Sequence, residues 1–153
     1  MVNAQNLNKS YKVDGRYIVN YVRRVMKHIK KDAVADISIV FLSDKQIRVL
    51  NEKHLGQDHP TDVLSFKIDR REFGSKRFLG EIFVSLDTAS RSAGKFGNTF
   101  QMEALLYVTH GILHLFGYDD LTAKEAGRMS RKQEEILRCL CRIKGLSKAL
   151  MPL

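Results

Sequence analysis

The chain has 153 residues, of which 26 are Lys or Arg and 17 are Asp or Glu, so its formal net charge is +9. Its fractions of hydrophobic (44%) and charged (28%) residues are those of a globular protein. The length suffices to bury a core, so we expect residues 1–153 to form a single domain. The positive charge favours a polyanionic partner, with nucleic acid first because phosphate neutralisation dominates such binding. A basic protein need not bind one, however.

No feature of the sequence predicts export or a membrane. The first eight residues lack a basic leader followed by an apolar stretch, and no apolar run is long enough to span a bilayer. The two cysteines, Cys139 and Cys141, lie two apart on a predicted helix and therefore point to different sides, which makes them a poor disulfide or metal pair. We expect a reduced, cytoplasmic protein.

The first half of the chain predicts a helix, a strand and a second helix. Residues 13–31 carry an apolar stripe at helical spacing with a basic opposite face. Residues 37–42 are strand-like. Ser43 and Gln46 then fit a capping box that opens a short helix through Leu50.

Two further β-rich runs follow, at residues 61–66 and 80–85, and the polar segment 67–77 with Gly74 is expected to be a loop between them. Residues 86–96 then predict a helix that ends near Gly97.

A long helix comes next, capped by Asn98 or Thr99. Its middle, residues 104–116, is apolar nearly all round, so it belongs in the centre of the fold. Thr122 and Glu125 form a capping box for a last helix, whose basic residues either face RNA or form a solvated face: Arg128, Arg131, Lys132, Arg138 and Arg142. The sum is a small α/β (α+β) domain, with a sheet of about four short strands and helices around it.

The central helix carries the most informative motif. His110 and His114 are four residues apart and project from one face of a helix. Gly117 can adopt the left-handed geometry that ends helices, so the chain can turn back and offer Asp120 to the same ion. Three N/O ligands with a position open for water are typical of a catalytic zinc site, so we expect one Zn²⁺. The alternative is a buried helix with two core histidines and a solvated acidic turn.

A missing residue favours RNA over peptide as the substrate. Zinc peptidases with a related H-E-x-x-H motif use its Glu as general base, and Gly111 stands at that position here. RNA offers its own 2′-hydroxyl as a nucleophile, and phosphoryl transfer depends mostly on positioning and charge neutralisation. Attack by metal hydroxide and attack by the 2′-hydroxyl both remain open.

Three blocks of sequence, residues 61–66, 79–82 and 110–119, resemble the bacterial YbeY family of rRNA maturation factors in their order and spacing. The resemblance implies a metal-dependent, single-strand-specific endoribonuclease that acts in 16S rRNA 3′-end maturation and small-subunit quality control. It also implies a mixed four-stranded sheet with a central metal-binding helix. The implied partners are rRNA and the small ribosomal subunit, a small-subunit ribosomal protein and the Era GTPase.

Two departures from the family pattern bear on the site. The motif ends in His where this chain has Asp120, which the family register favours over Asp119 as the ligand; a carboxylate oxygen binds zinc at about the same distance as imidazole, roughly 2.0–2.2 Å. Leu55 stands where the family carries an arginine, which puts cleavage in question more than metal binding. Neighbouring residues of this chain that could take over the role of that arginine are Lys53, His54, His59 and Lys67.

Asp62 and Ser65 are further candidates, on a strand expected beside the metal helix. They either order a groove for RNA or hydrogen-bond the backbone as turn and edge residues. Three functions follow: an endoribonuclease, a ribosome-assembly factor with a structural metal and little cleavage, and, disfavoured by Gly111, a metal-dependent peptidase.

Overall fold

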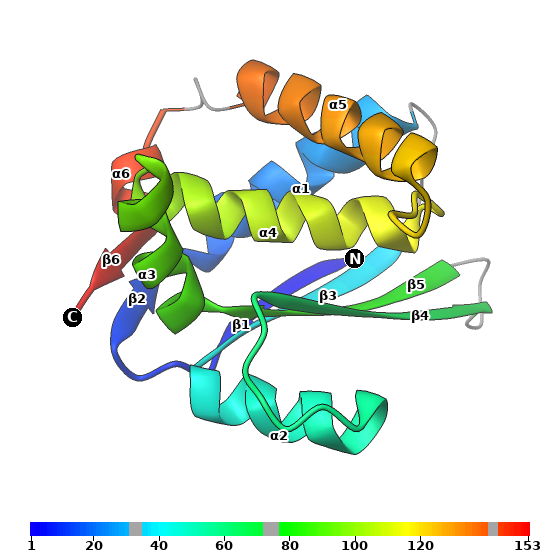
Figure 1. Ribbon diagram of the computed structural model, residues 1–153. Coiled ribbons are helices and arrows are strands. Elements are labelled where there is room, and N and C mark those ends of the chain that lie inside the picture. Colours follow the sequence, from blue (N-terminus) through cyan, green and yellow to red (C-terminus); the bar gives the residue numbers. More distant parts are fainter. Residues whose placement is uncertain (31–34, 72–76, 141–143) are drawn as a thin grey trace.

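The computed structural model describes residues 1–30, 35–71, 77–140 and 144–153 (Figure 1). Its strands are β1 (Val2–Asn6), β2 (Tyr11–Val13), β3 (Asp36–Leu42), β4 (Val63–Arg71), β5 (Arg77–Ser85) and β6 (Leu150–Pro152). Its helices are α1 (Gly15–Ile29), α2 (Asp44–Leu55), α3 (Leu86–Phe96), α4 (Phe100–Leu115), α5 (Ala123–Leu140) and α6 (Leu146–Ala149).

The strands form a mixed four-stranded sheet in the order β1-β3-β5-β4, as the family resemblance implies. Strands β1, β3 and β5 are parallel, while β4 runs antiparallel to β5 at the edge of the sheet. A separate antiparallel pair, β2 and β6, joins residues near the two ends of the described chain. The α/β fold class is therefore confirmed.

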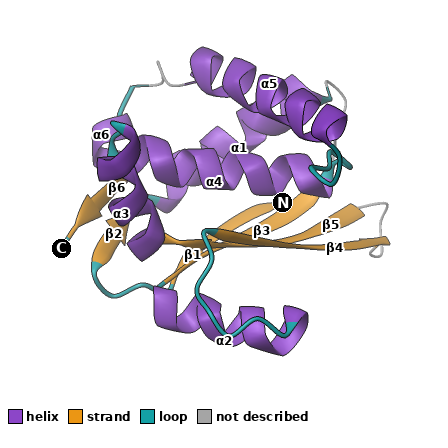
Figure 2. Cartoon of the chain, in the orientation of Figure 1, coloured by secondary structure: helices purple, strands orange, loops and turns teal. Residues whose placement is uncertain are grey.

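The elements stack in layers (Figure 2). Helices α1 and α4 cover one face of the sheet, α5 lies across them, and α2 covers the other face. The predicted central position of α4 is confirmed, because ten of its sixteen residues are buried. Inside this layer the hydroxyls of Tyr21 on α1 and Thr109 on α4 hydrogen-bond at 2.7 Å, which satisfies both polar groups in the core.

The helix ends follow the predicted caps. Ser43 and Gln46 form the complete capping box of α2. Of the two candidates for α4, Thr99 is the cap, and its hydroxyl accepts a hydrogen bond from the amide of Met102. Gly117, just after α4, has a φ of +91°, a left-handed conformation that glycine adopts without a steric penalty. The chain therefore turns back directly after the histidines.

The prediction of a loop over residues 67–77 is wrong at both of its ends. Strand β4 continues to Arg71 and β5 begins at Arg77, with a register shift near Asp69, whose φ is +47°. The polar sequence hid this pairing because residues 67–71 are exposed beyond the core and need no apolar face. The predicted features at Gly74, Cys141 and Arg142 lie outside the described residues.

Among the residues that the structure describes, no helix combines the length and apolar character needed to cross a bilayer.

Candidate metal centre

The structure brings the three predicted ligands together at the C-terminal end of α4. The Nε2 atoms of His110 and His114 lie 3.0 Å apart, and a carboxylate oxygen of Asp120 lies 3.9 Å from each of them. Helix geometry places the two imidazoles on one face, and the turn at Gly117 returns the carboxylate to them. We call these three residues the metal triad.

The other nitrogen of each imidazole has an acceptor. The Nδ1 of His114 donates to the backbone carbonyl of Tyr118 at 3.1 Å, and the Nδ1 of His110 lies 3.1 Å from the side-chain oxygen of Gln133. A carbonyl oxygen only accepts, so these contacts favour the neutral tautomer of each imidazole with its proton on Nδ1. Both Nε2 atoms are then left as electron-pair donors that face each other.

Electrostatics favour the neutral, metal-binding form of His110. Burial lowers the pKa of this imidazole, and the neighbouring His114 lowers it further. The hydrogen bond with Gln133 and the charges of Asp62 and Asp120 act in the opposite direction but do not reverse the shift. Protons therefore compete less with a metal ion for this imidazole than for one with an ordinary pKa.

The donor set fits a transition metal. Ligand atoms bound at roughly 2.0–2.1 Å to a tetrahedral ion lie about 3.3–3.4 Å apart, and the observed separations of 3.0 and 3.9 Å bracket that value. Two imidazoles and one carboxylate leave a fourth position open. Asp120 is 49% exposed, so this position is accessible to solvent. The triad is close enough to bind one metal ion.

Asp119 is not part of the triad. Its carboxylate accepts a hydrogen bond of 2.7 Å from the amide of Asp120 and so braces the turn that presents the ligand. It lines a different, smaller hollow beside Tyr118 and Arg128. The geometry thus agrees with the assignment of Asp120 as the third ligand.

A family model for Endoribonuclease YbeY matches residues 3–140 of this chain. The chain belongs to the YbeY family. Curated proteins named Endoribonuclease YbeY are similar to it: that of Pelotomaculum thermopropionicum is 43% identical over 67% of this chain and 70% of its own, and that of Syntrophus aciditrophicus is 32% identical over 86% and 84%. The solution structure of a Thermotoga maritima protein is 30% identical, with a TM-score of 0.61, and covers 90% of this chain and 87% of its own.

The triad of this YbeY-family chain lies in an open cleft of about 520 Å³ between α4, the edge strand β4 and the end of α2. Apart from the triad it is lined by Leu55, Asp62, Val63, Leu64, Ser65 and Phe66. A cleft of this size is typical of sites that bind small ligands or part of a polymer.

Asp62 and Ser65 line the cleft, and they also bond to backbone. One carboxylate oxygen of Asp62 accepts from the amide of Val63, and the hydroxyl of Ser65 donates to the carbonyl of Gly111 at 3.4 Å. Both readings of these residues, as groove residues and as edge residues, are compatible with this placement. The hydrogen bond from Ser65 joins the wall of the cleft to the metal helix, whereas the bond to Asp62 lies within the wall itself.

At Gly111 the helix α4 lies close against the sheet. A Cβ at this position would lie 2.6 Å from Cγ2 of Ile82 and 2.9 Å from the hydroxyl oxygen of Ser65. A glutamate side chain therefore has no room here, because position 111 faces Ile82 and Ser65 of the sheet at short range. The absence of the peptidase general base has a structural cause.

The residues proposed as substitutes for the family arginine lie elsewhere, while Leu55 itself lies in the cleft and is 56% exposed. The imidazole of His54 packs on the ring of Phe66, with centroids 4.9 Å apart. Lys67 lines a separate hollow beside Arg77 at the end of α4. Neither His54 nor Lys67 lines the metal cleft.

Sequence reasoning missed Gln133 and Tyr118 as partners of the histidines. The carbonyl of Tyr118 carries no side-chain signal, and its role follows only from the turn geometry. Gln133 is 23 residues from His110 along the chain. No spacing rule connects them, because the packing of α5 on α4 makes the contact.

Proposed function

We propose that this protein is a zinc-dependent, single-strand-specific endoribonuclease that acts in 16S rRNA 3′-end maturation and in quality control of the small ribosomal subunit. One observation carries the proposal: the Nε2 atoms of His110 and His114 and a carboxylate oxygen of Asp120 converge in an open cleft, with an accepting oxygen beside the Nδ1 of each imidazole. Membership of a family whose curated members are named endoribonucleases supports RNA as the substrate.

His110, His114 and Asp120 would hold the ion. A bound divalent ion supplies positive charge to a phosphoryl oxygen and lowers the pKa of a coordinated water. The chain itself orients the ligands through Gln133 and the Tyr118 carbonyl, and it leaves the exposed side of Asp120 open toward the substrate. Strand β4 forms one wall along which a single strand would lie, with the hydroxyl of Ser65 tied to α4.

The partners we propose are rRNA and the small ribosomal subunit, together with a small-subunit ribosomal protein and the Era GTPase, in the cytoplasm. The net charge of +9 supports a polyanionic partner. The protein partners follow from the family resemblance.

A second candidate, a ribosome-assembly factor with a structural metal and little cleavage, is favoured by Leu55. This side chain occupies the cleft wall and offers no charge to a phosphate. A peptidase is disfavoured because Gly111 sits against the sheet, where no general base fits.

The test measures zinc content and cleavage of single-stranded RNA for the wild type, His114→Ala and the matched control His28→Ala. His28 pairs with Glu135 between α1 and α5, outside the cleft, so its removal should change little. We expect the wild type and the control to bind one zinc and cleave RNA, and His114→Ala to lose both.

Other outcomes separate the alternatives. RNA binding and zinc without turnover would favour the assembly factor, and cleavage of peptides would favour the peptidase. Sequencing of 16S 3′ ends in cells that lack the protein, complemented with wild type or His114→Ala, tests the rRNA role. Mature ends restored equally by both genes would contradict it.

A further inference from the structure

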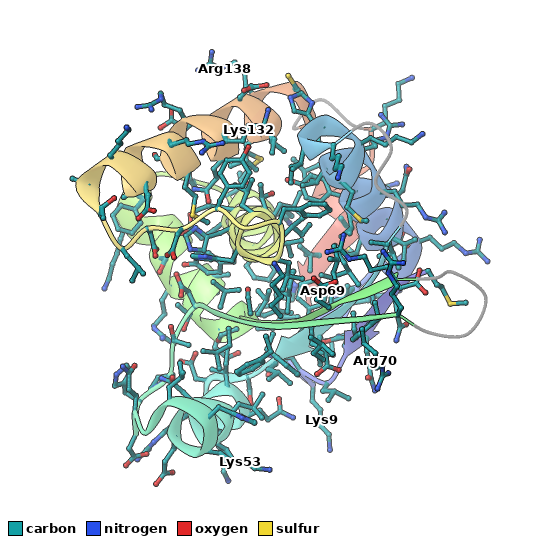
Figure 3. The ribbon with its side chains drawn as sticks, turned by 90° about the vertical axis from the view of Figure 1, so that its right-hand side faces the viewer. Lys9, Lys53, Asp69, Arg70, Lys132 and Arg138 are labelled. Atoms are coloured by element: carbon teal, nitrogen blue, oxygen red, sulfur yellow. The ribbon has the colours of Figure 1, made fainter. Side chains whose placement is uncertain are left out.

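We infer that helix α5 positions both metal-binding histidines, and that Gln133 is the positioning residue through which it orients His110. The inference rests on the proposed metal centre and assigns a role to a helix that contributes no ligand. Figure 1 and Figure 3 both place α5 over α4, on the side away from the sheet.

The first contact from α5 is direct. The side-chain oxygen of Gln133 lies 3.1 Å from Nδ1 of His110, and both side chains are partly buried. An accepting oxygen at this place holds the proton on Nδ1 and fixes the rotation of the ring. The Nε2 lone pair of His110 is thereby aimed at the centre of the metal triad.

The second contact is indirect. His114 donates from Nδ1 to the carbonyl of Tyr118, and the guanidinium of Arg128 on α5 lies 5.2 Å from the centre of the Tyr118 ring. A cation over an aromatic face is attractive, so α5 also restrains the residue that holds His114. Arg128, expected on the polar face of the last helix, thus contacts the turn that supports the site.

The position of helix α5 is held by its apolar side, which packs in the core. Met129, Ile136 and Leu140 are buried in the main core. Gln133 lies between the first two of these along the helix, so its backbone cannot shift without moving buried side chains. The metal triad is therefore oriented from the layer above α4, whereas its cleft opens on the side of strand β4.

Such a contact matters because it raises the fraction of molecules in which the imidazole has the orientation and tautomer that bind metal. An imidazole without an outer partner populates other ring rotations and the other tautomer, and the apparent dissociation constant rises by the inverse of the competent fraction. Loss of an outer partner of a metal-bound histidine costs about 10–100-fold in metal affinity. Leucine is close to glutamine in size and accepts no hydrogen bond, so it isolates this effect.

The experiment measures the zinc dissociation constant of the purified full chain by competition with a chromophoric chelator. We expect Gln133→Leu to raise the constant about 10–100-fold. Gln133→Glu retains an accepting oxygen and should stay within about threefold of the wild type or bind more tightly. Glu134→Leu, one residue along on the exposed side of α5, is the matched control and should leave the constant unchanged.

Three results would overturn the inference: equal zinc affinity of Gln133→Leu and wild type, equal losses in Gln133→Leu and Glu134→Leu, or a Gln133→Glu variant as weak as Gln133→Leu. If Gln133→Leu does not fold, the comparison of Gln133→Glu with wild type decides, since a large loss of affinity contradicts the role. The absorption spectrum of bound cobalt(II) should change with Gln133→Leu and not with Glu134→Leu. A wild type that binds no metal would refute the proposed centre as well, whereas the results above refute the role of α5 alone.

Discussion

Two clusters of polar side chains each contain an aspartate, and they differ in the balance of donors and acceptors. In the Asp44 cluster the carboxylate accepts hydrogen bonds from the hydroxyls of Ser85 and Thr88 and from the guanidinium of Arg91. Every side chain that hydrogen-bonds the Asp44 carboxylate is a donor, and the Asp87 carboxylate accepts from the Asp44 backbone amide, so the cluster is complete. It ties the start of α2 to the start of α3 and needs nothing else.

The metal triad has the opposite balance. An accepting oxygen lies beside the outer nitrogen, Nδ1, of each imidazole, so in the neutral tautomer that carries its proton there the two Nε2 atoms and the Asp120 oxygen are all acceptors. Such a group of acceptors is stable only when a cation or added protons lie among them. The two clusters therefore differ in their donors: the protein supplies donors to the Asp44 carboxylate, whereas the metal triad leaves its acceptors to an added cation.

The largest change in metal affinity is expected at Asp120. Asp120→Asn removes the anionic ligand and should raise the zinc dissociation constant by about 100-fold or more, beyond the loss from an outer partner. Asp119→Asn is the control, because Asp119 only braces the turn, and it should change the constant by less than about tenfold. Calorimetric zinc titration measures both, and a greater loss in Asp119→Asn would move the third ligand to Asp119.

The next effect concerns the packing that brings the triad to the cleft. Gly111→Ala forces a Cβ against Ile82 and the hydroxyl of Ser65 and should reduce the free energy of unfolding by about 1–3 kcal/mol. Gly94→Ala on α3 meets no atom within 4 Å and should raise it by roughly 0.5–1 kcal/mol. Urea denaturation measures both, and an unchanged stability in Gly111→Ala would contradict the close approach of α4 to the sheet.

A smaller effect is expected in the pH dependence of stability, through the Asp44 cluster. Burial opposes the charge of Asp44, but the hydrogen bonds from Ser85, Thr88 and Arg91 together lower its pKa below the ordinary value of 3.8. A carboxylate with a lowered pKa stabilises the fold above its ordinary pKa, and this contribution is lost as pH falls through the lowered value.

The free energy of unfolding of Asp44→Asn should therefore be roughly 1 kcal/mol lower than that of wild type at neutral pH. This difference should shrink below pH 3.8. Thermal unfolding across this range measures it. Zinc affinity should not change. A difference in the free energy of unfolding that stays constant with pH would contradict the stabilising role of the charged Asp44 carboxylate.

The smallest effect concerns the cleft wall. Leu55 is exposed, so Leu55→Ala should change the free energy of unfolding by less than about 0.5 kcal/mol. Leu55→Arg adds one cation beside the metal triad, and it should steepen the salt dependence of single-stranded RNA binding by about 0.7 in the logarithmic slope. An unchanged slope would place the RNA strand away from Leu55.

Local patterns predicted much of this fold because their signals are local. The capping box at Ser43, the apolar length of α4 and the turn at Gly117 all follow from spacing and were confirmed. Strand β1 was not predicted because its alternation in exposure involves only two apolar residues, Val2 and Ala4, and only Val2 is fully buried. The short β2–β6 pair depends on residues at opposite ends of the chain.

The candidate site divides in the same way. His110, His114 and Asp120 lie within eleven residues of sequence, so helix geometry and one turn predict that they converge. The partner of His110 on α5 and the position of Leu55 on the cleft wall depend on how distant helices pack. His54 and Lys67 have suitable chemistry and lie near the family motif in sequence, but His54 packs on the cleft-lining Phe66 without lining the cleft itself, and Lys67 lines a separate hollow.

Anomalous X-ray scattering at the zinc edge, from crystals of the full chain grown with zinc, locates the metal ion directly. We predict a single strong peak about 2.0–2.2 Å from Nε2 of His110, Nε2 of His114 and a carboxylate oxygen of Asp120. If crystals grown at saturating zinc show no peak among these three atoms, the metal centre is contradicted.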